Sequence, residues 1–332
     1  VYDRVSVEHL AALVGWSVGD LGQLSENAFV TQGFTRQLTD SFETIDLLYA
    51  LGRFMGDPTQ PREFVRKALD RLTASMQFGW VACWMGASPR ARRMEARDAI
   101  LSGPRAIEPA RVQRACELLA SRLTPESRSA IHNGAGDLPL PDGTQYLVQP
   151  IVRAGGVLGL LVAGDKRGDD PQVSSYDIHL LEAAGAFIGA FMENAILYAE
   201  QNAMFLGSLT ALTSSIDAKD RYTFGHSERV AHMARALGQA LGLPAATCER
   251  LHICGLVHDV GKIGVPESVL LKPGRLTDAK FEQIKLHPTI GHRILKDIPL
   301  MEDILPGVLH HHERWDGRGY PAGLAGDAIP LF

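Results

Sequence analysis

The sequence predicts a two-domain protein: an α+β domain in the first two thirds, a long connecting helix, and an all-α domain in the last third. Three observations carry this prediction. Helical patterns and then Val- and Leu-rich runs between residues 41 and 164 indicate helices beside a sheet. About forty residues from Tyr176 onward place apolar side chains at helical spacing. Nine of the twelve histidines fall between His226 and His312, within helical patterns.

Composition limits the class of protein. The chain has 332 residues, of which 45% are hydrophobic and 21% charged, as in globular proteins with more than one core. A net charge of -5 argues against binding of duplex nucleic acid. Four cysteines without C-x-x-C spacing argue against a disulfide framework.

The chain shows no signal pattern and no apolar run of the ~20 residues that a membrane span requires. A cytoplasmic location is therefore expected. The first residue is Val rather than Met, which suggests a cut from a longer chain.

The N-terminal elements follow in order. Residues 1–42 are expected to form a short helical segment, to which no role is assigned. A helix is predicted over residues 42–55, and prolines then end it before a second helix over 63–76. Strands are predicted at 78–86, 144–152 and 156–164, with a turn at 153–156 between the last two. Pro150 favours an edge position or a bulge. After a loop at 165–175, the long helix suits a signalling or coiled-coil connector.

Residues 43–198 resemble a GAF domain. The resemblance rests on the hairpin YLVQPIVRAGGVLGLLVAG and on the exit helix SSYDIHLLEAAGAFIGAFMENA. It implies a sensor for a ligand that the sequence does not name, and a homodimer formed through paired exit helices. Three nearby arginines are an anion site or a solvated loop, and the loop is favoured: Arg90, Arg92 and Arg93.

The C-terminal elements are helices that deliver histidines. His226 is predicted to begin a helix that ends near Gly242, with an apolar stripe at Val230, Met233, Leu237 and Leu241. The next helix carries His258 and Asp259 near its end, where glycines follow. Thr277 is a predicted N-cap of a helix that runs to His287 and is stopped by Pro288. A short helix then delivers His310, His311 and His312 to a glycine-rich loop.

Imidazole and carboxylate ligands together suit divalent Mn, Fe and Zn. A lone histidine on an amphipathic helix is more often structural, and this interpretation is applied to His232, His252 and His292. The role of His310 stays open. The remaining residues are predicted jointly to bind metal: His226, His258, Asp259, His287, His311 and His312.

The same region resembles the HD-GYP domain, a subgroup of the HD phosphohydrolases. The motifs are H-D-x-G-K at 258–262, H-H-E-R-W-D-G-x-G-Y-P at 311–321, and K-P-G-x-L-T before His287. The resemblance covers residues 209–332, and the domain is expected to span 199–332. It implies an HD-type helical bundle, joined to the GAF-like domain by the long helix. It also implies a phosphodiesterase that hydrolyses cyclic di-GMP to pGpG and/or GMP under control of the GAF domain.

Roles for single residues follow from this resemblance. It implies the six metal ligands named above, with Asp259 bridging two ions and acting in catalysis. Lys262 would be a catalytic charge clamp that also binds the substrate phosphate; the alternative is an ordinary surface lysine. Arg314 would contact phosphate or guanine. Gly319, Tyr320 and Pro321 would bind or admit the substrate, or contact a GGDEF-domain partner.

Two departures from the family pattern bear on this prediction. Some family members have a Glu where this chain has Tyr222, and those members hold a third metal; two ions, Fe or Mn, are therefore expected here. Family members also continue into a segment with a further Asp ligand, which would lie beyond Phe332, so the domain is expected to be C-terminally incomplete. The alternative to the enzyme is a non-catalytic signalling or interaction protein that binds cyclic di-GMP or metal. A hydrolase for another nucleotide is disfavoured by the intact GYP loop.

Overall fold

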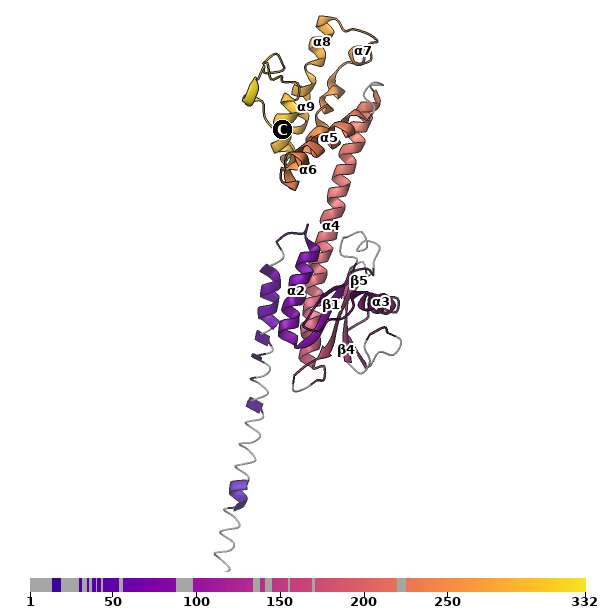
Figure 1. Ribbon diagram of the computed structural model, residues 1–332, viewed down its shortest axis with the longest axis vertical. Helices are drawn as coiled ribbons and strands as arrows, with labels where there is room; N and C mark the ends of the chain where they lie inside the picture. Colours follow the sequence, from indigo (N-terminus) through magenta and orange to yellow (C-terminus); the bar gives the residue numbers. More distant parts are fainter. Residues whose placement is uncertain are drawn as a thin grey trace, which may run out of the picture. The chain divides into compact units, whose positions relative to one another are not determined.

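The computed structural model describes residues 14–18, 30–31, 35, 38–39, 41–42, 44–53, 56–87, 98–133, 138–140, 145–154, 156–168, 171–219 and 225–332. The chain divides into two compact units, Val1–Glu200 and Gln201–Phe332 (Figure 1). Most of the expected helical segment at 1–42 lies outside the described residues. So do Tyr222 and the three arginines at 90, 92 and 93.

The first unit is built on a five-stranded antiparallel sheet in the order β2-β1-β5-β4-β3. Its strands are β1 Phe78–Trp84, β2 Ile100–Ser102, β3 Ala130–Asn133, β4 Gln145–Arg153 and β5 Gly156–Lys166. The three predicted strands are confirmed as β1, β4 and β5. Strands β2 and β3 were not predicted, because each is short and β3 is mostly exposed.

Helices cover both faces of this sheet (Figure 1). Helices α2 (Pro61–Met76) and α4 (Ser175–Lys219) share a core with one face, to which β1 contributes Val81 and Cys83. Helix α3 (Pro109–Ala120) packs on the other face, against Trp80 and Trp84. Both faces of β1 are therefore buried, and the strand consists of a continuous apolar run rather than an alternating pattern.

Pro150 lies in an interior strand, so the predicted edge position holds only locally. Strand β3 pairs with Gln145–Val148 of β4 and reaches no farther, whereas Pro150 pairs with Leu160 of β5. The register between β4 and β5 shifts between Ile151 and Val152. A proline, which has no N–H to donate, is thus accommodated where one side of its strand has no partner among the described strands and a bulge follows.

Helix α4 confirms the predicted long helix and is 45 residues long. Near its start the buried carboxylate of Asp177 binds Lys166 at 2.6 Å and accepts a hydrogen bond from Ser174 N–H at 2.8 Å. Within the described residues, α4 is the one helix long and apolar enough to cross a membrane by length and composition. However, 56% of its most apolar stretch is buried inside the protein, as in a core helix.

Helices and loops make up the described residues of the second unit, apart from one isolated bridge between Asp316 and Ala325. Its core joins the end of α4, through Leu209 and Ile216, to side chains such as Val257 and Val308. The elements are α5 His226–Ala240, α6 Ala245–Val257, η2 Val260–Gly264, α7 Glu267–Leu270, α8 Asp278–Ile284, α9 His287–Leu295, η3 Pro299–Ile304, α10 Leu305–His310 and η4 Gly326–Ala328.

Two glycines let these helices cross closely. A Cβ added at Gly255 of α6 would lie 2.8 Å from the Cα of Ala231 in α5. A Cβ added at Gly261 of η2 would overlap the carbonyl oxygen of His287 at the start of α9. The first crossing sets the distance between α5 and α6, and the second sets the distance between η2 and α9.

Three details differ from the sequence prediction. His287 begins α9 instead of ending the preceding helix, because Pro288 occupies the first turn, where proline is favoured. Thr277 is the N-cap of α8, but its side chain makes no capping hydrogen bond. The apolar stripe of α5 faces outward, with Met233 and Leu237 more than 60% exposed. Helix α5 instead buries small residues such as Ala231, because its close crossing with α6 leaves no room for larger ones.

Candidate metal centre

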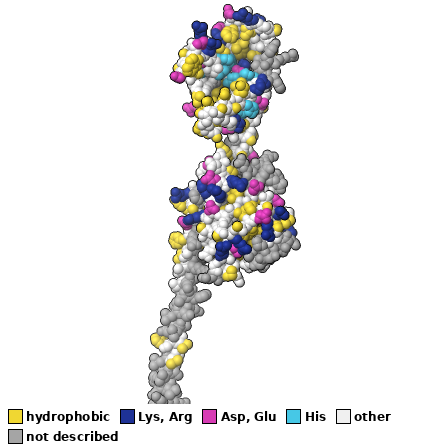
Figure 2. All heavy atoms as spheres, viewed as in Figure 1, with side chains coloured by type: hydrophobic (Ala, Val, Ile, Leu, Met, Phe, Trp, Pro, Cys, Tyr) yellow, Lys and Arg dark blue, Asp and Glu magenta, His cyan; other side chains and the backbone are white. Residues whose placement is uncertain are grey.

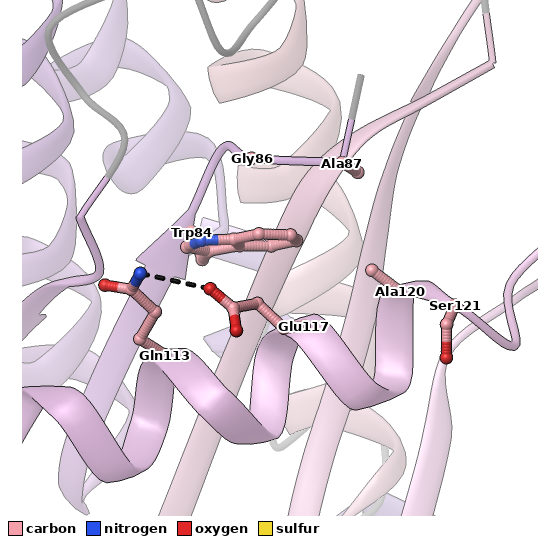
Figure 3. A pocket seen from close by; sticks show the side chains of 7 residues that line it. All are labelled: Trp84, Gly86, Ala87, Gln113, Glu117, Ala120 and Ser121. Atoms are coloured by element: carbon pink, nitrogen blue, oxygen red, sulfur yellow. Dashed lines mark hydrogen bonds between the residues drawn. The ribbon is translucent and has the colours of Figure 1, made fainter. Parts of the chain in front are cut away.

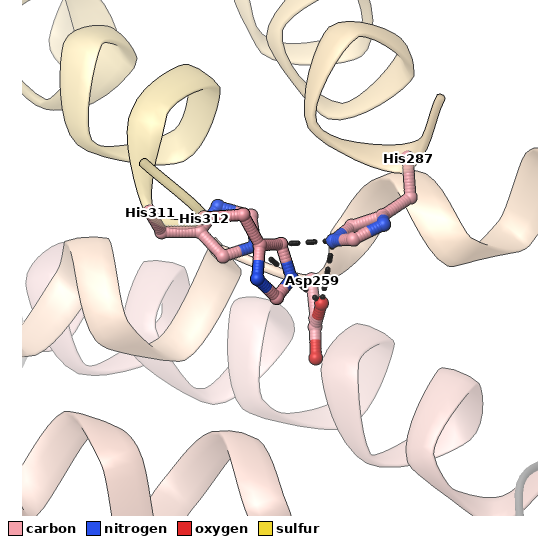
Figure 4. Close-up of side chains that lie close together, drawn as sticks. All are labelled: Asp259, His287, His311 and His312. Atoms are coloured by element: carbon pink, nitrogen blue, oxygen red, sulfur yellow. Dashed lines mark hydrogen bonds and ion pairs between the residues drawn. The ribbon is translucent and has the colours of Figure 1, made fainter. Parts of the chain in front are cut away.

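The fold brings the six predicted ligands together in two overlapping groups, and Figure 4 shows the group of four: Asp259, His287, His311 and His312. Asp259, His287, His311 and His312 offer ligand atoms within 4.8 Å of one another, and so do His226, His258 and Asp259. Asp259 belongs to both groups. Histidine side chains gather on one visible face of the C-terminal unit in Figure 2.

Every ligand stands at the end of a helix. His226 and His287 are the first residues of α5 and α9, His258 follows the last residue of α6, and His311 follows the last residue of α10. Consecutive residues in a helix point about 100° apart. The helix breaks at Asp259, whose φ and ψ are -97° and 6°, and this break lets the adjacent His258 and Asp259 face the same centre.

The two oxygens of Asp259 face different histidines. Oδ2 lies 3.3 Å from His258 Nε2 and 3.7 Å from His226 Nε2. Oδ1 lies 3.1 Å from His287 Nε2 and 3.8 Å from His311 Nε2. The carboxylate is nearly buried, at 4% exposure. It therefore stands between two sets of imidazole nitrogens, one set at each oxygen.

Backbone carbonyls orient three of the rings. The Nδ1 atoms of His258, His287 and His311 lie 2.7, 2.7 and 2.9 Å from the carbonyl oxygens of Gly255, Ile284 and Val308. In each case the carbonyl belongs to the residue three positions earlier. A carbonyl oxygen accepts only, so Nδ1 carries the proton and the Nε2 lone pair is directed into the cluster.

The residues fit a divalent cation. With their Nδ1 atoms bonded to carbonyl oxygens, His287 and His311 direct two Nε2 atoms at each other at 3.0 Å. Two lone pairs at this distance need a shared cation or proton between them. Asp259 Oδ1 is buried and has no hydrogen-bond partner among the described residues. Imidazole nitrogens around a carboxylate are suitable ligands for Mn, Fe or Zn.

Electrostatics keep the cluster in its ligand form. Burial raises the pKa of Asp259, but His258, His287 and the nearby Lys262 outweigh burial and hold this pKa well below its usual range. Burial lowers the pKa of His311 to about 3, and neighbouring His258 and His312 add to the shift. Burial and His287 lower the pKa of His312 to about 4. At neutral pH the carboxylate is therefore charged and these two imidazoles are neutral.

Lys262 and Tyr320 adjoin the cluster. The ammonium of Lys262 lies 2.7 Å from Asp259 Oδ2. The Tyr320 ring stacks on His312 with centroids 4.7 Å apart, and burial raises the pKa of its hydroxyl to about 12. Lys285 Nζ lies 5.8 Å from the Tyr320 ring centroid. Lys285 lies outside all of the sequence motifs that predicted the site, so no local pattern identified it.

The loop after His312 is held by a residue that the sequence analysis left without a role. Glu313 has a fully buried side chain and accepts hydrogen bonds from the N–H groups of Ala322 and Leu324 at 2.8 and 3.0 Å. Gly319 packs directly on this residue, and an added Cβ would overlap the Cα of Glu313. Pro321 follows a cis peptide bond. The position of Glu313 inside the H-H-E-R-W run is the signal that could have identified it.

Arg314 lies outside both ligand groups. Its guanidinium donates two hydrogen bonds to Asp316, at 3.0 and 2.7 Å, and its side chain is 65% exposed. The histidines expected to be structural are also outside these groups. Two of them, His232 and His252, contact each other with ring centroids 5.2 Å apart. His310 is also outside both groups, and its Nδ1 atom lies 3.5 Å from Oε1 of Glu313.

The first unit has a separate pocket of about 610 Å³ beside α3 (Figure 3). The indole of Trp84 borders it, together with Gln113 and Glu117, which hydrogen-bond to each other at 3.1 Å. Among the described residues that line it, Glu117 is the one charged side chain.

The C-terminal unit is similar to known proteins. Residues 211–332 match the HD domain family. A cyclic di-GMP phosphodiesterase of Pseudomonas aeruginosa is 42% identical over 136 residues, which is 40% of this chain and 33% of that protein. A cyclic di-GMP phosphodiesterase response regulator of Xanthomonas campestris is 41% identical over 127 residues, 37% of this chain and 33% of that protein.

A third relative is named for another cyclic dinucleotide. A 3'3'-cGAMP-specific phosphodiesterase of Vibrio cholerae is 39% identical over 120 residues, 36% of this chain and 28% of that protein. The chain thus spans about a third of the length of the curated relatives it matches. The helical C-terminal region carries an HD domain, and the N-terminal region is an antiparallel sheet with helices.

Proposed function

We propose that this chain carries the catalytic domain of a divalent-metal-dependent phosphodiesterase that hydrolyses cyclic di-GMP to pGpG and/or GMP. One observation carries the proposal: Asp259 has imidazole nitrogens at both of its oxygens, so this one carboxylate could contribute a ligand to each of two ions. The names of relatives with about 40% identity support the reaction class and the substrate.

The ligands divide between the two ions, for which Fe or Mn is proposed. His226 and His258 would serve the ion at Oδ2 of Asp259, and the other three ligands would serve the ion at Oδ1: His287, His311 and His312. When bound, such ions ionise a water molecule near neutral pH and polarise the phosphoryl group. The carbonyls that hold the Nδ1 atoms would keep three of the rings in place throughout the reaction.

Residues beside the ions would bind the substrate. Lys262, at the edge of the centre, is proposed as the charge clamp for the phosphate. Gly319, Tyr320 and Pro321 would border the approach of the dinucleotide, because Tyr320 stacks directly on the ligand His312. Arg314 would have to release Asp316 before it could contact phosphate or guanine.

The remaining proposals concern regulation and partners. Residues 43–198 are proposed to form a GAF-type sensor whose ligand is unknown, and the pocket beside Trp84 is a place to look for that ligand. We propose a cytoplasmic homodimer, paired through α4, whose apolar side chains Leu197 and Met204 are exposed. The loop with Tyr320 is a proposed contact for a GGDEF-domain partner.

The test is a reaction with the full chain. The protein is loaded with Mn²⁺, or with Fe²⁺ under anaerobic conditions, and its metal content is measured. Cyclic di-GMP and, separately, 3'3'-cGAMP are added, and products are separated by chromatography. Linear products from cyclic di-GMP are expected, and none from an Asp259→Asn variant; His292→Ala serves as a matched control outside the ligand groups.

Two results would contradict this proposal. Turnover of 3'3'-cGAMP alone would move the substrate assignment to the other dinucleotide for which a relative is named. A metal-loaded chain that binds cyclic di-GMP and forms no linear product would support the non-catalytic binding protein instead.

A further inference from the structure

We propose that Asp217, at the end of α4, is a positioning residue for His226 and so controls one of the two metal sites. The inference rests on the proposed metal centre and adds a residue that lies outside both ligand groups. It concerns the ion at Oδ2 of Asp259, the side that His226 and His258 face.

Asp217 and Ser227 form a buried clamp between α4 and α5. Oδ2 of Asp217 accepts a hydrogen bond from the backbone N–H of Ser227 at 3.1 Å, and Oδ1 accepts one from the Ser227 hydroxyl at 3.0 Å. Asp217 is 4% exposed and Ser227 is 2% exposed. The carboxylate therefore acts as the N-terminal cap of α5, although it belongs to another helix. The preceding Gly225 supplies no side chain for that purpose.

The clamp acts on the backbone that carries His226. This histidine is the residue directly before Ser227, so the clamp fixes its backbone. The rings of His258, His287 and His311 are held by carbonyl oxygens, whereas no described residue makes a comparable hydrogen bond to His226 Nδ1. Its side chain is also 38% exposed. The bonds to Ser227 thus tie the start of α5, and with it the backbone of His226, to Asp217.

Asp217 is suited to positioning and not to metal binding. Both of its oxygens already accept hydrogen bonds from Ser227, one from the backbone N–H and one from the hydroxyl. The α4 end that carries it is itself fixed, because Leu209 and Ile216 are buried in the core of the C-terminal unit. A displacement of this helix end would reach His226 through two hydrogen bonds.

The experiment measures Mn²⁺ binding to the full chain, by titration and by metal content after dialysis at a set free Mn²⁺ concentration. Asp217→Ala removes both hydrogen bonds. We expect it to lower the affinity for one of the two Mn²⁺ ions by about tenfold or more, while the affinity for the other ion is retained. Ser227→Ala removes only the hydroxyl bond and should have a smaller effect in the same direction. Asp217→Asn keeps an acceptor for the Ser227 N–H and should rescue most of the binding.

Thr213→Ala is the matched control. Thr213 is equally buried one turn earlier in α4, but its hydroxyl bonds only within that helix, to the carbonyl oxygens of Leu209 and Thr210. It removes a buried hydroxyl from the same helix without touching the clamp, so it should leave both ions bound. In a double variant with His226→Ala, Asp217→Ala should have no additional effect on metal affinity, because it acts through that histidine.

The outcomes separate this inference from the proposed function. If His226→Ala keeps both ions at wild-type affinity, the metal centre is wrongly assigned. If His226→Ala loses one ion while Asp217→Ala and Ser227→Ala bind metal as Thr213→Ala does, the centre stands and the positioning role is overturned. If Asp217→Ala does not fold, Ser227→Ala decides in the same way.

Discussion

At the scale of single residues, the two oxygens of Asp259 have different surroundings. Oδ2 faces His226, His258 and the ammonium of Lys262, whereas Oδ1 faces two imidazoles and has no hydrogen-bond partner among the described residues. Removal of this one negative charge should therefore affect both sides of the centre at once.

Asp259→Asn tests this expectation. The amide has nearly the same shape as the carboxylate but no charge, and its nitrogen cannot coordinate a metal ion. We expect both Mn²⁺ ions to bind at least about 100-fold more weakly, measured by titration and by metal content. His292→Ala should bind metal like the wild type. If the Asp259→Asn variant still held two tightly bound ions, Asp259 would not be the shared ligand.

Protonation of the ligand histidines should destabilise the metal-free protein in acid. In the unfolded chain these imidazoles take up protons near pH 6.5, but in the folded protein the pKa is lowered to about 3 for His311 and about 4 for His312. Between pH 6.5 and 4 the unfolded state thus binds more protons, and stability falls as the pH falls.

The melting temperature of chelator-treated protein, measured from pH 7.5 to 4.5, is the test. It should decline below pH 6.5, and His311→Gln should flatten the decline, whereas His292→Gln should leave the slope unchanged. An identical slope for His311→Gln would show that this histidine does not cause the acid sensitivity.

At the scale of elements, the close crossing of η2 and α9 sets the distance between Asp259 and His287. Gly261→Ala would drive a methyl group into the His287 carbonyl, and α9 would have to move. We expect a loss of about 3 kcal/mol of unfolding free energy, together with weaker metal binding. Denaturant unfolding and Mn²⁺ titration measure the two effects.

Gly207→Ala is the matched control for that substitution. Gly207 is an exposed helical glycine of α4 with no atom near an added Cβ, so alanine there should be neutral or stabilising by up to about 1 kcal/mol. Equal stabilities of the two variants would show that the crossing tolerates a side chain.

Local patterns predicted the elements with long apolar repeats and missed those defined by tertiary contacts. The spacing from Tyr176 onward predicted α4, and the H-D-x-G-K run predicted the break beside Asp259. The short strand β3 has its pairing partner far along the chain, which no local pattern shows. The stripe with Met233 was misleading, because Gly255 in another helix determines which face of α5 is buried.

The same distinction applies to the site. Histidines and carboxylates at ordered spacings identified a set of residues that the fold does bring together. The division of Asp259 between two groups, and the bond between Asp217 and Ser227, depend on the positions of whole helices. The sequence alone could not predict them.

At the scale of the whole molecule, α4 leaves apolar side chains exposed after its buried first half. Leu197 and Met204 are 49% and 69% exposed and lie seven residues apart, the spacing of a coiled-coil seam. We expect a homodimer in light scattering. Met204→Glu should shift it toward monomer, with a dissociation constant raised at least about tenfold, because a charge would be desolvated in the interface.

Asn202→Glu is the control, about 140° around the helix from Leu197. It adds the same charge to α4 and should leave the dimer intact. A monomeric wild-type chain, or equal effects of the two substitutions, would argue against pairing through this face.

The placement of every ligand at a helix end has a consequence for folding. The ligands run from position 226 to position 312, so bound ions would cross-link distant parts of the chain and would do so only in the folded state. An ion present at 100 times its dissociation constant adds about 2.7 kcal/mol to the free energy of unfolding. In calorimetry, Mn²⁺ should therefore raise the melting transition of the C-terminal unit and leave that of the N-terminal unit in place. Bound ions would then also stabilise the fold of the C-terminal unit, and a chelator would remove that stabilisation.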